Sequence, residues 1–316
     1  MTSHTAPPQH ESIHPDTRIG LIGLQVADLD RSLQFYTDVL GFIEIERADR
    51  SAVLGPVDAR PLLVLRELKG ARPKPREATG LYHFAVLLPS RADLGRAVQR
   101  LQEFNHPIRE FEDHLVSESA YLADPDGNGI ELYRDRPRAE WPRKDGRVTM
   151  GSEPIDVPQL LADGASDGRA WAGLPAGTRI GHLHLQVADI PQADAFYRGI
   201  LGFDLIVNMK TALFVSAGGY HHHLGMNVWF SQAGPLPPPD AAGLLAATIE
   251  FADDRARAEV VDRLATAGVA TSLQGDAIAV HDAWGNTLLL VVGAPGSAAD
   301  ALGLFSAASP GHAASE

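Results

Sequence analysis

An internal repeat constrains the fold of this chain more than any other feature of its sequence. The segment RIGLIGLQVADLDRSLQFYTDVLGF, which begins at Arg18, aligns without gaps with RIGHLHLQVADIPQADAFYRGILGF, which begins at Arg179, and about half of the aligned residues are identical. Two weaker copies, GLYHFAVLLPSRADLGRAVQRL and GLLAATIEFADDRARAEVVDRL, follow at similar spacing. Each of these is followed by a related segment, DPDGNGIELY or DAWGNTLLLV. The chain therefore contains four related modules, at residues 18–68, 79–136, 178–232 and 243–293.

Hydrophobic periodicity predicts the same order of elements in each module. The segment LHLQVAD alternates apolar and polar residues with a period of two, which is typical of a half-buried strand. The segment DIPQADAFYRGILGF places apolar residues at steps of three and four, which predicts an amphipathic helix with Asp189 as its N-cap and Gly202 at its end. Short apolar runs separated by Gly and Pro follow. Each module is thus predicted to be one strand, one helix and three strands, and the fold class is α+β.

The modules group into two halves along the sequence. The N-terminal half covers residues 18–136, and the C-terminal half covers residues 178–293. Residues 137–177 are rich in Gly, Pro and charged side chains, which predicts a linker. The two ends of the chain, residues 1–16 and 294–316, are predicted to be mobile tails.

The composition excludes several classes of function. The chain has 27 basic and 40 acidic residues, a net charge of −13, which argues against binding to nucleic acid and to anionic membranes. It has no apolar run of about 18 residues that could span a bilayer, and its first residues lack the pattern of a secretory signal. We therefore expect a cytoplasmic protein, and the sequence leaves open whether it forms a homo-oligomer. Cysteine is absent, which excludes disulfides and thiolate ligands and directs attention to the 13 histidines.

The four modules resemble a known family. The first strands HFAVLL and HLHLQV and the last strand DPDGNGIEL resemble the vicinal oxygen chelate superfamily, in which βαβββ modules form two open β-barrels with a glyoxalase-like fold. The segments GLYHFAVLLP, DHLVSESAYLADPDGNGIELY, GHLHLQVADI and SAGGYHHHLGMNVW are similar to type I extradiol dioxygenases, and most of all to the catechol 2,3-dioxygenase branch of Bacillus-like bacteria. The resemblance covers nearly the whole of the four modules.

The resemblance implies a metal site made of three side chains. The family places its ligands at the start of a module's first strand and on its last strand. In module two these positions hold His83 and Glu131, and in module three the first-strand position holds His182. The equivalent positions in modules one and four hold apolar residues, namely Leu21, Ala246 and Leu289. Two histidines and one carboxylate are the ligand set of non-haem Fe(II) oxygen chemistry, and Mn(II) also accepts this set.

The triple histidine of module three supplies the acid–base residue that the resemblance implies. The run follows a Gly-Gly turn and enters an apolar strand, where the family places a His-His pair. In that register His222 is the acid–base residue, and His221 and His223 point to the opposite face if the segment is extended. A shift of one residue would give the role to His223. His184 lies two residues beyond His182 on the same strand face, so it either replaces His182 as a ligand or lies beside the pocket.

Two further residues of module two match positions of the family. Tyr121 precedes Glu131 by the interval that separates the family's active-site tyrosine from its metal-binding glutamate, so the resemblance implies a hydrogen bond from its phenol to the substrate. The alternative is an ordinary half-buried tyrosine on a strand. His114 matches a family histidine near the substrate hydroxyl and the O₂ site, although the loop around it is shorter here.

The function that the resemblance implies is extradiol ring cleavage in aromatic hydrocarbon catabolism. Its substrates are a catechol-type small molecule and O₂, both oxygen atoms stay in the product, and the cofactor is Fe(II). A glyoxalase-like metal-dependent lyase shares the fold but usually takes one carboxylate from each of two modules, whereas the matching strand of module three carries histidines and no acid. A metal-free small-molecule-binding protein of the same superfamily is the other alternative.

The distribution of these ligands predicts which modules meet. If sequence neighbours paired, His182 would be separated from His83 and Glu131, and neither barrel would hold three ligands. If module two pairs with module three, the three residues come together, and the 137–177 linker has the reach for this because extended chain covers about 3.3 Å per residue. Modules two and three are therefore predicted to share the active barrel, within one chain or between two chains, while modules one and four form a structural barrel.

Overall fold

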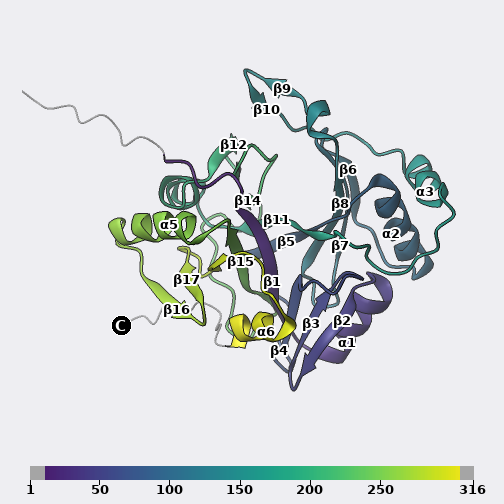
Figure 1. Cartoon of the computed structure of the whole chain (residues 1–316), viewed down its shortest axis with the longest axis horizontal. Coiled ribbons are helices and arrows are strands. Elements are labelled where there is room, and N and C mark those ends of the chain that lie inside the picture. Colours follow the sequence, from purple (N-terminus) through teal and green to yellow (C-terminus); the bar gives the residue numbers. More distant parts are fainter. Residues whose placement is uncertain (1–10, 307–316) are drawn as a thin grey trace, which may run out of the picture.

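The computed structural model describes residues 11–306, which form two eight-stranded sheets with helices packed against them (Figure 1). Strands and helices alternate along the chain in the order predicted for βαβββ modules. The predicted α+β fold class is therefore confirmed. Both sheets have the same arrangement of strands, because each contains two modules joined through their first strands.

Modules one and four form the first sheet, whose strand order is β16-β17-β18-β15-β1-β4-β3-β2. The strands of module one are β1 (Arg18–Val26), β2 (Ile43–Ala48), β3 (Ser51–Gly55) and β4 (Leu63–Glu67). The strands of module four are β15 (Gly243–Phe251), β16 (Thr271–Gln274), β17 (Ala277–His281) and β18 (Thr287–Val292). Within each module the first and last strands are parallel, and β1 pairs antiparallel with β15.

Modules two and three form the second sheet, in the order β12-β13-β14-β11-β5-β8-β7-β6. The strands of module two are β5 (Gly80–Leu87), β6 (Glu110–Asp113), β7 (Ser117–Ala123) and β8 (Gly129–Asp135). The strands of module three are β11 (Arg179–Gln186), β12 (Asp204–Met209), β13 (Ala212–Ser216) and β14 (Leu224–Asn227). The antiparallel pairing of β5 with β11 joins the two modules within one chain.

Each module has one helical segment between its first two strands. The segments are α1 (Leu29–Gln34) with the π-helix η1 (Phe35–Val39), α2 (Arg91–Glu103), α4 (Ile190–Ala193) with the π-helix η3 (Asp194–Ile200), and α5 (Asp254–Thr266). In module three the side chain of Asp189 accepts the N–H of Gln192, as expected for an N-cap. Gly202 has a φ of +89°, a left-handed conformation that suits glycine after the end of a helix.

The linker between modules two and three is structured and packs on module two. It contains η2 (Arg138–Glu140), β9 (Arg143–Lys144), β10 (Arg147–Val148) and α3 (Val157–Ala165). Helix α3 packs closely on α2, because a Cβ atom on Gly95 would lie only 2.2 Å from the carbonyl oxygen of Leu160. The linker therefore helps to cover the second sheet instead of only spanning the distance between modules.

The two related turns before β8 and β18 each hold a buried carboxylate. In the DPDGNG turn, Asp124 accepts the backbone N–H of Asn128 and the hydroxyl of Tyr36, which comes from module one. In the DAWGN turn, Asp282 accepts the hydroxyl of Tyr197, which comes from module three, at 2.8 Å. These hydrogen bonds tie each module to its neighbour in sequence, although the two neighbours belong to different sheets.

The segment after module four differs from the predicted mobile tail. Residues Ala298–Ser306 form helix α6, and the side chain of Phe305 is only 1% exposed. Phe305 packs so closely on β1 that a Cβ atom on Gly23 would lie 2.2 Å from its ring. The helix belongs to an apolar cluster with the three residues that stand at the ligand positions of modules one and four, namely Leu21, Ala246 and Leu289. Apolar burial therefore orders a segment whose Ala- and Gly-rich composition indicates flexibility.

The start of the described chain is also packed. Ile13 is buried, and its backbone N–H donates a hydrogen bond of 2.7 Å to the carbonyl of Gly202. Ile13 is therefore packed within a segment that the sequence predicts to be mobile. The remaining parts of both predicted tails, residues 1–10 and 307–316, lie outside the described residues.

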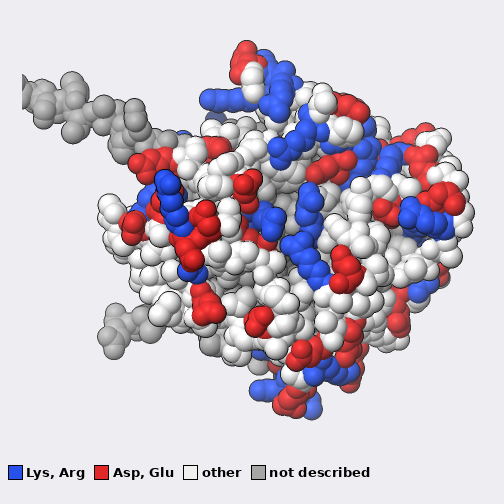
Figure 2. Space-filling view, in the orientation of Figure 1, with Lys and Arg blue, Asp and Glu red and all other residues white. Residues whose placement is uncertain are grey.

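The surface carries charges of both signs. In Figure 2 red and blue side chains are interspersed over much of the visible face, despite the net charge of −13. Within residues 11–306, no helix is both long enough and apolar enough to cross a membrane.

Replacing Phe305 with Ala should lower the free energy of unfolding by about 3–5 kcal/mol, because the change removes buried apolar contacts and leaves a cavity. Chemical denaturation of the full chain measures the effect. The exposed Ser306→Ala change in the same helix is the control and should stay within about 0.5 kcal/mol of the parent. An unchanged unfolding midpoint for Phe305→Ala would show that α6 contributes nothing to the core.

Candidate metal centre

The register of three strands brings His83, Glu131 and His182 together. Ala85 on β5 pairs with His182 on β11 and also with Glu131 on β8. Paired residues on neighbouring strands point their side chains to the same face of the sheet, and His83, two residues before Ala85, shares that face. Because Ala85 carries only a methyl group, the longer side chains on either side of it can meet above it.

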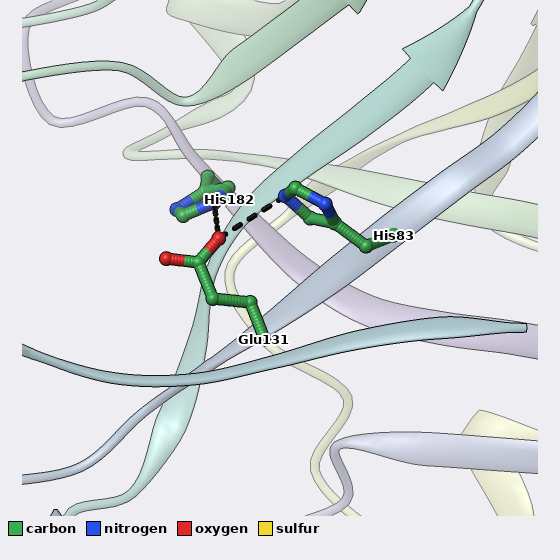
Figure 3. Close-up of side chains that lie close together, drawn as sticks. All are labelled: His83, Glu131 and His182. Atoms are coloured by element: carbon green, nitrogen blue, oxygen red, sulfur yellow. Dashed lines mark hydrogen bonds and ion pairs between the residues drawn. The ribbon is translucent and has the colours of Figure 1, made fainter. Parts of the chain in front are cut away.

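The three side chains converge on one carboxylate oxygen (Figure 3). The Nε2 atom of His182 lies 2.8 Å from Oε2 of Glu131, and Nε2 of His83 lies 3.1 Å from the same oxygen. Each residue offers one ligand atom, these atoms all lie within 4.8 Å of one another, and all three residues are buried. Among residues 11–306, no other group of His, Asp and Glu side chains brings three ligand atoms together in this way.

The donor set fits a divalent metal ion. The Nε2 atom of His83 and the Nδ1 atom of His182 are buried and have no hydrogen-bond partner among the described residues. The 3.1 Å contact of His83 with Glu131 is close, but its geometry is not that of a hydrogen bond. A buried polar atom without a partner costs about 1–3 kcal/mol. Coordination of a metal by His83 would give its nitrogen the partner that the protein does not supply.

Burial and mutual contact set the protonation of these candidate ligands. Burial lowers the pKa of His83, although Glu131 opposes this, so the imidazole is neutral. Burial alone would raise the pKa of Glu131, but contact with His182 and His83 outweighs it and holds that pKa well below its usual range. A neutral imidazole and an ionised carboxylate are the forms that bind metals.

Ser119 orients the carboxylate of Glu131. Its hydroxyl donates a hydrogen bond of 2.6 Å to Oε1 of Glu131, so the other oxygen, Oε2, faces the two imidazoles. Sequence reasoning missed this residue. The available signal was the strand period of two, because Ser119 precedes Tyr121 by two residues on β7 and therefore shares its face.

Tyr121 and His114 lie next to each other beside His83. The ring centroids of Tyr121 and His83 are 5.5 Å apart. The Nδ1 atom of His114 lies 3.0 Å from the carbonyl oxygen of Gly151, which can only accept, so Nδ1 donates this hydrogen bond. Its Nε2 atom lies 2.8 Å from the hydroxyl of Tyr121 and 3.2 Å from a carboxylate oxygen of Glu112. Burial raises the pKa of Tyr121 well above its usual value and keeps the phenol protonated.

The triple histidine is arranged differently from the extended strand considered in the sequence analysis. His221, His222 and His223 precede β14, which begins at Leu224. The ring of His222 packs on that of His182 with centroids 4.1 Å apart, and the Nδ1 atoms of His221 and His222 lie 3.0 Å apart. His221 and His222 are therefore in contact instead of lying on opposite faces. The turn before the strand allows this, because it removes the alternation of an extended chain.

His223 and His222 differ in their contacts. The Nδ1 atom of His223 accepts the backbone N–H of Ala217 at 3.1 Å, so this side chain holds the turn. Burial lowers the pKa of His223 to about 3 and lowers that of His222 well below its usual value. Both rings are therefore neutral. Of the two, His222 is the one whose ring packs against His182, with the ring planes tilted by 48°.

His184 lies beside the three converging residues but does not contact Glu131. Its ring is 4.9 Å from that of His83 between centroids, and its Nε2 atom accepts the side-chain amide of Asn227 at 3.0 Å. The rings of Tyr82 and the half-exposed Trp229 lie 5.1 and 5.6 Å from it. These aromatic rings form an apolar wall at this edge of the candidate site.

Asp135 is a second residue that sequence reasoning missed. Its Oδ1 atom lies 2.9 Å from Nε2 of His221. It follows Glu131 by four residues on β8, so the alternation of the strand places both carboxylates on the same face. That spacing was the available signal.

Comparison with known proteins agrees with the fold. The model of the glyoxalase/bleomycin resistance protein/dioxygenase superfamily matches residues 18–132 and 179–284. A catechol-2,3-dioxygenase of Bacillus subtilis strain 168 is 45% identical over 275 residues, which are 86% of this chain and 95% of that protein.

Two solved structures share the fold at low sequence identity. A putative dioxygenase from Bacillus subtilis aligns with a TM-score of 0.64 and 14% identity over 90% of this chain and 87% of its own. Glyoxalase I from Zea mays aligns with a TM-score of 0.54 and 15% identity over 93% of this chain and 96% of its own. The family match over most of the modules, together with the 45% identical relative, shows that the chain belongs to the glyoxalase/bleomycin resistance protein/dioxygenase superfamily.

Proposed function

We propose that this chain is an extradiol dioxygenase, which opens the ring of a catechol beside its two hydroxyl groups and incorporates both atoms of O₂. The observation that carries this proposal is the buried convergence of His83, His182 and Glu131 on one face of the second sheet. The 45% identity to a catechol-2,3-dioxygenase supports the same reaction. A glyoxalase-like lyase would take one acid from each of two modules. The segment of module three that should supply the second acid carries His221–His223 instead, which counts against the lyase alternative.

The proposed metal ligands are His83, His182 and Glu131, and the proposed metal is Fe(II). When bound, such an ion stabilises negative charge and acts as a template for both reactants. The same donor set accepts Mn(II), so metal analysis of the freshly purified protein decides between the two ions. Ser119 keeps the Oε2 atom of Glu131 directed at the imidazoles and so pre-organises the ligands.

Proton transfer is assigned to His222. Its neutral imidazole can accept the proton that leaves a diol hydroxyl and can return that proton later in the reaction. Its ring packs against that of His182, which places it directly beside the proposed metal ligands. Tyr121 and His114 are proposed to contact the substrate oxygens from the side of His83, with the phenol held by its hydrogen bond to His114.

Addition of a catechol to the aerobic, Fe(II)-reconstituted protein should give a yellow ring-opened product, with one O₂ consumed for each catechol. Absorbance and oxygen uptake measure the two quantities together. The metal-free protein is the control and should do neither. If the protein retains its metal but converts neither catechol nor substituted catechols, the proposed reaction is wrong and a lyase or a binding function remains.

Replacing Glu131 with Ala should abolish metal retention, because it removes the carboxylate that both imidazoles face. Metal content per chain after gel filtration measures this. Glu250→Gln is the matched control, since Glu250 is a buried carboxylate of the other sheet that pairs with Arg18. Its metal content should equal that of the parent. Full metal content in Glu131→Ala would place the site elsewhere.

Replacing His222 with Ala should leave metal content unchanged and lower kcat by about 10²–10⁴-fold, the usual contribution of general acid–base catalysis. Steady-state kinetics and metal analysis of the same preparation test this. His223→Asn tests the neighbouring residue, whose contacts with the turn predict a smaller effect on kcat. Parent turnover in His222→Ala, with loss of turnover in His223→Asn, would transfer the role to His223.

A further inference from the structure

We propose that a cationic cavity at the junction of the two sheets binds a small anion that carries two or more phosphate or carboxylate groups. The cavity has a volume of about 300 Å³, and four arginines line it, namely Arg18, Arg60, Arg138 and Arg179. None of the three proposed metal ligands lines this cavity. The inference therefore does not rest on the proposed function.

The fold brings these four arginines together from separate segments. Arg18 and Arg179 are the first residues of β1 and β11, so they occupy the same position in the repeated segments. The strands β1 and β11 belong to different sheets and are in contact with each other. Arg60 lies in the loop between β3 and β4, and Arg138 begins η2 in the linker. Module one, module three and the linker therefore build the cavity together.

Strand pairing supplies a carboxylate to Arg18 but not to Arg179. Arg18 lies opposite Glu250 on β15 and donates a hydrogen bond of 2.7 Å to its Oε2 atom. The guanidinium of Arg60 lies 3.8 Å from the same oxygen. In the equivalent pairing of the second sheet, Arg179 lies opposite Leu87 on β5, and a leucine side chain cannot accept a hydrogen bond. The same position of the repeat therefore carries a paired arginine in one sheet and an arginine without this partner in the other.

Arg138 is held by aromatic rings instead of by a carboxylate. Its guanidinium carbon lies 5.4 Å from the ring centroid of Trp141 and 5.7 Å from that of Tyr220, distances at which a ring attracts a cation. Among the residues that the structure describes, neither Arg138 nor Arg179 forms an ion pair with a carboxylate. Both residues are also exposed, so their charges are available to a ligand.

The cavity carries an excess of positive charge in an acidic protein. Asp16 is the one carboxylate among the residues that line it, and the buried Glu250 contacts Arg18 and Arg60. These two acids leave two of the four guanidinium charges uncompensated, although the whole chain has a net charge of −13.

Arginine chemistry and the size of the cavity indicate the class of ligand. Arginine stays protonated at physiological pH, and its planar fork donates paired hydrogen bonds to phosphate and carboxylate oxygens. The volume of about 300 Å³ lies at the lower end of the range for small-molecule pockets, about 300–1,000 Å³. The arginines stand on separate segments around this space, so a molecule with two or more anionic groups can contact several of them at once.

Equilibrium dialysis of the full chain, with its metal bound, against radiolabelled pyrophosphate or citrate at low ionic strength tests the site. We expect one anion to bind per chain, with a Kd that rises as salt is added, because salt screens the charges. Tighter binding of pyrophosphate would identify phosphate as the preferred group, and tighter binding of citrate would identify carboxylate. If neither probe binds at millimolar concentration, the inference is wrong, whether or not the protein cleaves catechol.

Two arginine variants locate the bound anion. Arg138→Gln and Arg179→Gln should each raise Kd by about 10-fold or more, because each removes a charged hydrogen-bond donor from the cavity. Arg255→Gln is the matched control, since it removes an exposed arginine of α5, and its Kd should equal that of the parent. An equal rise of Kd in all three variants would show attraction to the surface charge in general and would overturn the site.

The variant Glu131→Ala separates the cavity from the candidate metal centre, because both probes can also chelate a metal ion. Its Kd for the anion should equal that of the parent, since Glu131 does not line the cavity. Loss of anion binding in Glu131→Ala, with parent binding in Arg138→Gln and Arg179→Gln, would place the anion on the metal and overturn the inference.

Discussion

The antiparallel pairing of β5 with β11 is the contact on which the candidate metal centre depends. It joins a strand of module two to a strand of module three and sets Ala85 opposite His182. The parallel pairing of β5 with β8 sets the same alanine beside Glu131. A slip of one residue in either register would turn one of these side chains to the other face of the sheet. The strand pairing therefore decides both the order of strands in the sheet and the meeting of the candidate ligands.

The two sheets share one topology but have opposite interiors. In the second sheet three ionisable residues are buried together, which costs free energy unless each is paired or coordinated. In the first sheet the equivalent positions are apolar, and Phe305 of α6 packs among them. The apolar interior stabilises the chain through ordinary burial. One half of the repeated structure thus supplies a hydrophobic core where the other half supplies a polar site.

Burial favours the neutral form of several histidines of the second sheet. It lowers the pKa of His83, His184, His222 and His223, so these rings are neutral at physiological pH. Neutral imidazoles bind metal ions and accept protons, whereas charged ones do neither. Asp135, which lies beyond the candidate ligands, contacts His221, and His221 contacts His222, whose ring packs against His182.

The sequence by itself determined the four modules, the order of their elements and the residue types available for chemistry, because periodicity and motif spacing are local properties of the chain. Through its family resemblance it also narrowed the predicted metal ligands to His83, His182 and Glu131. Tertiary structure decided the contacts of Ser119 and Asp135, the turn that brings His221 against His222, and the packing of α6. These features depend on side chains from distant segments. The energy of a hydrogen bond or of a buried ring depends on which partner it meets, and that partner is fixed only when the sheets have formed.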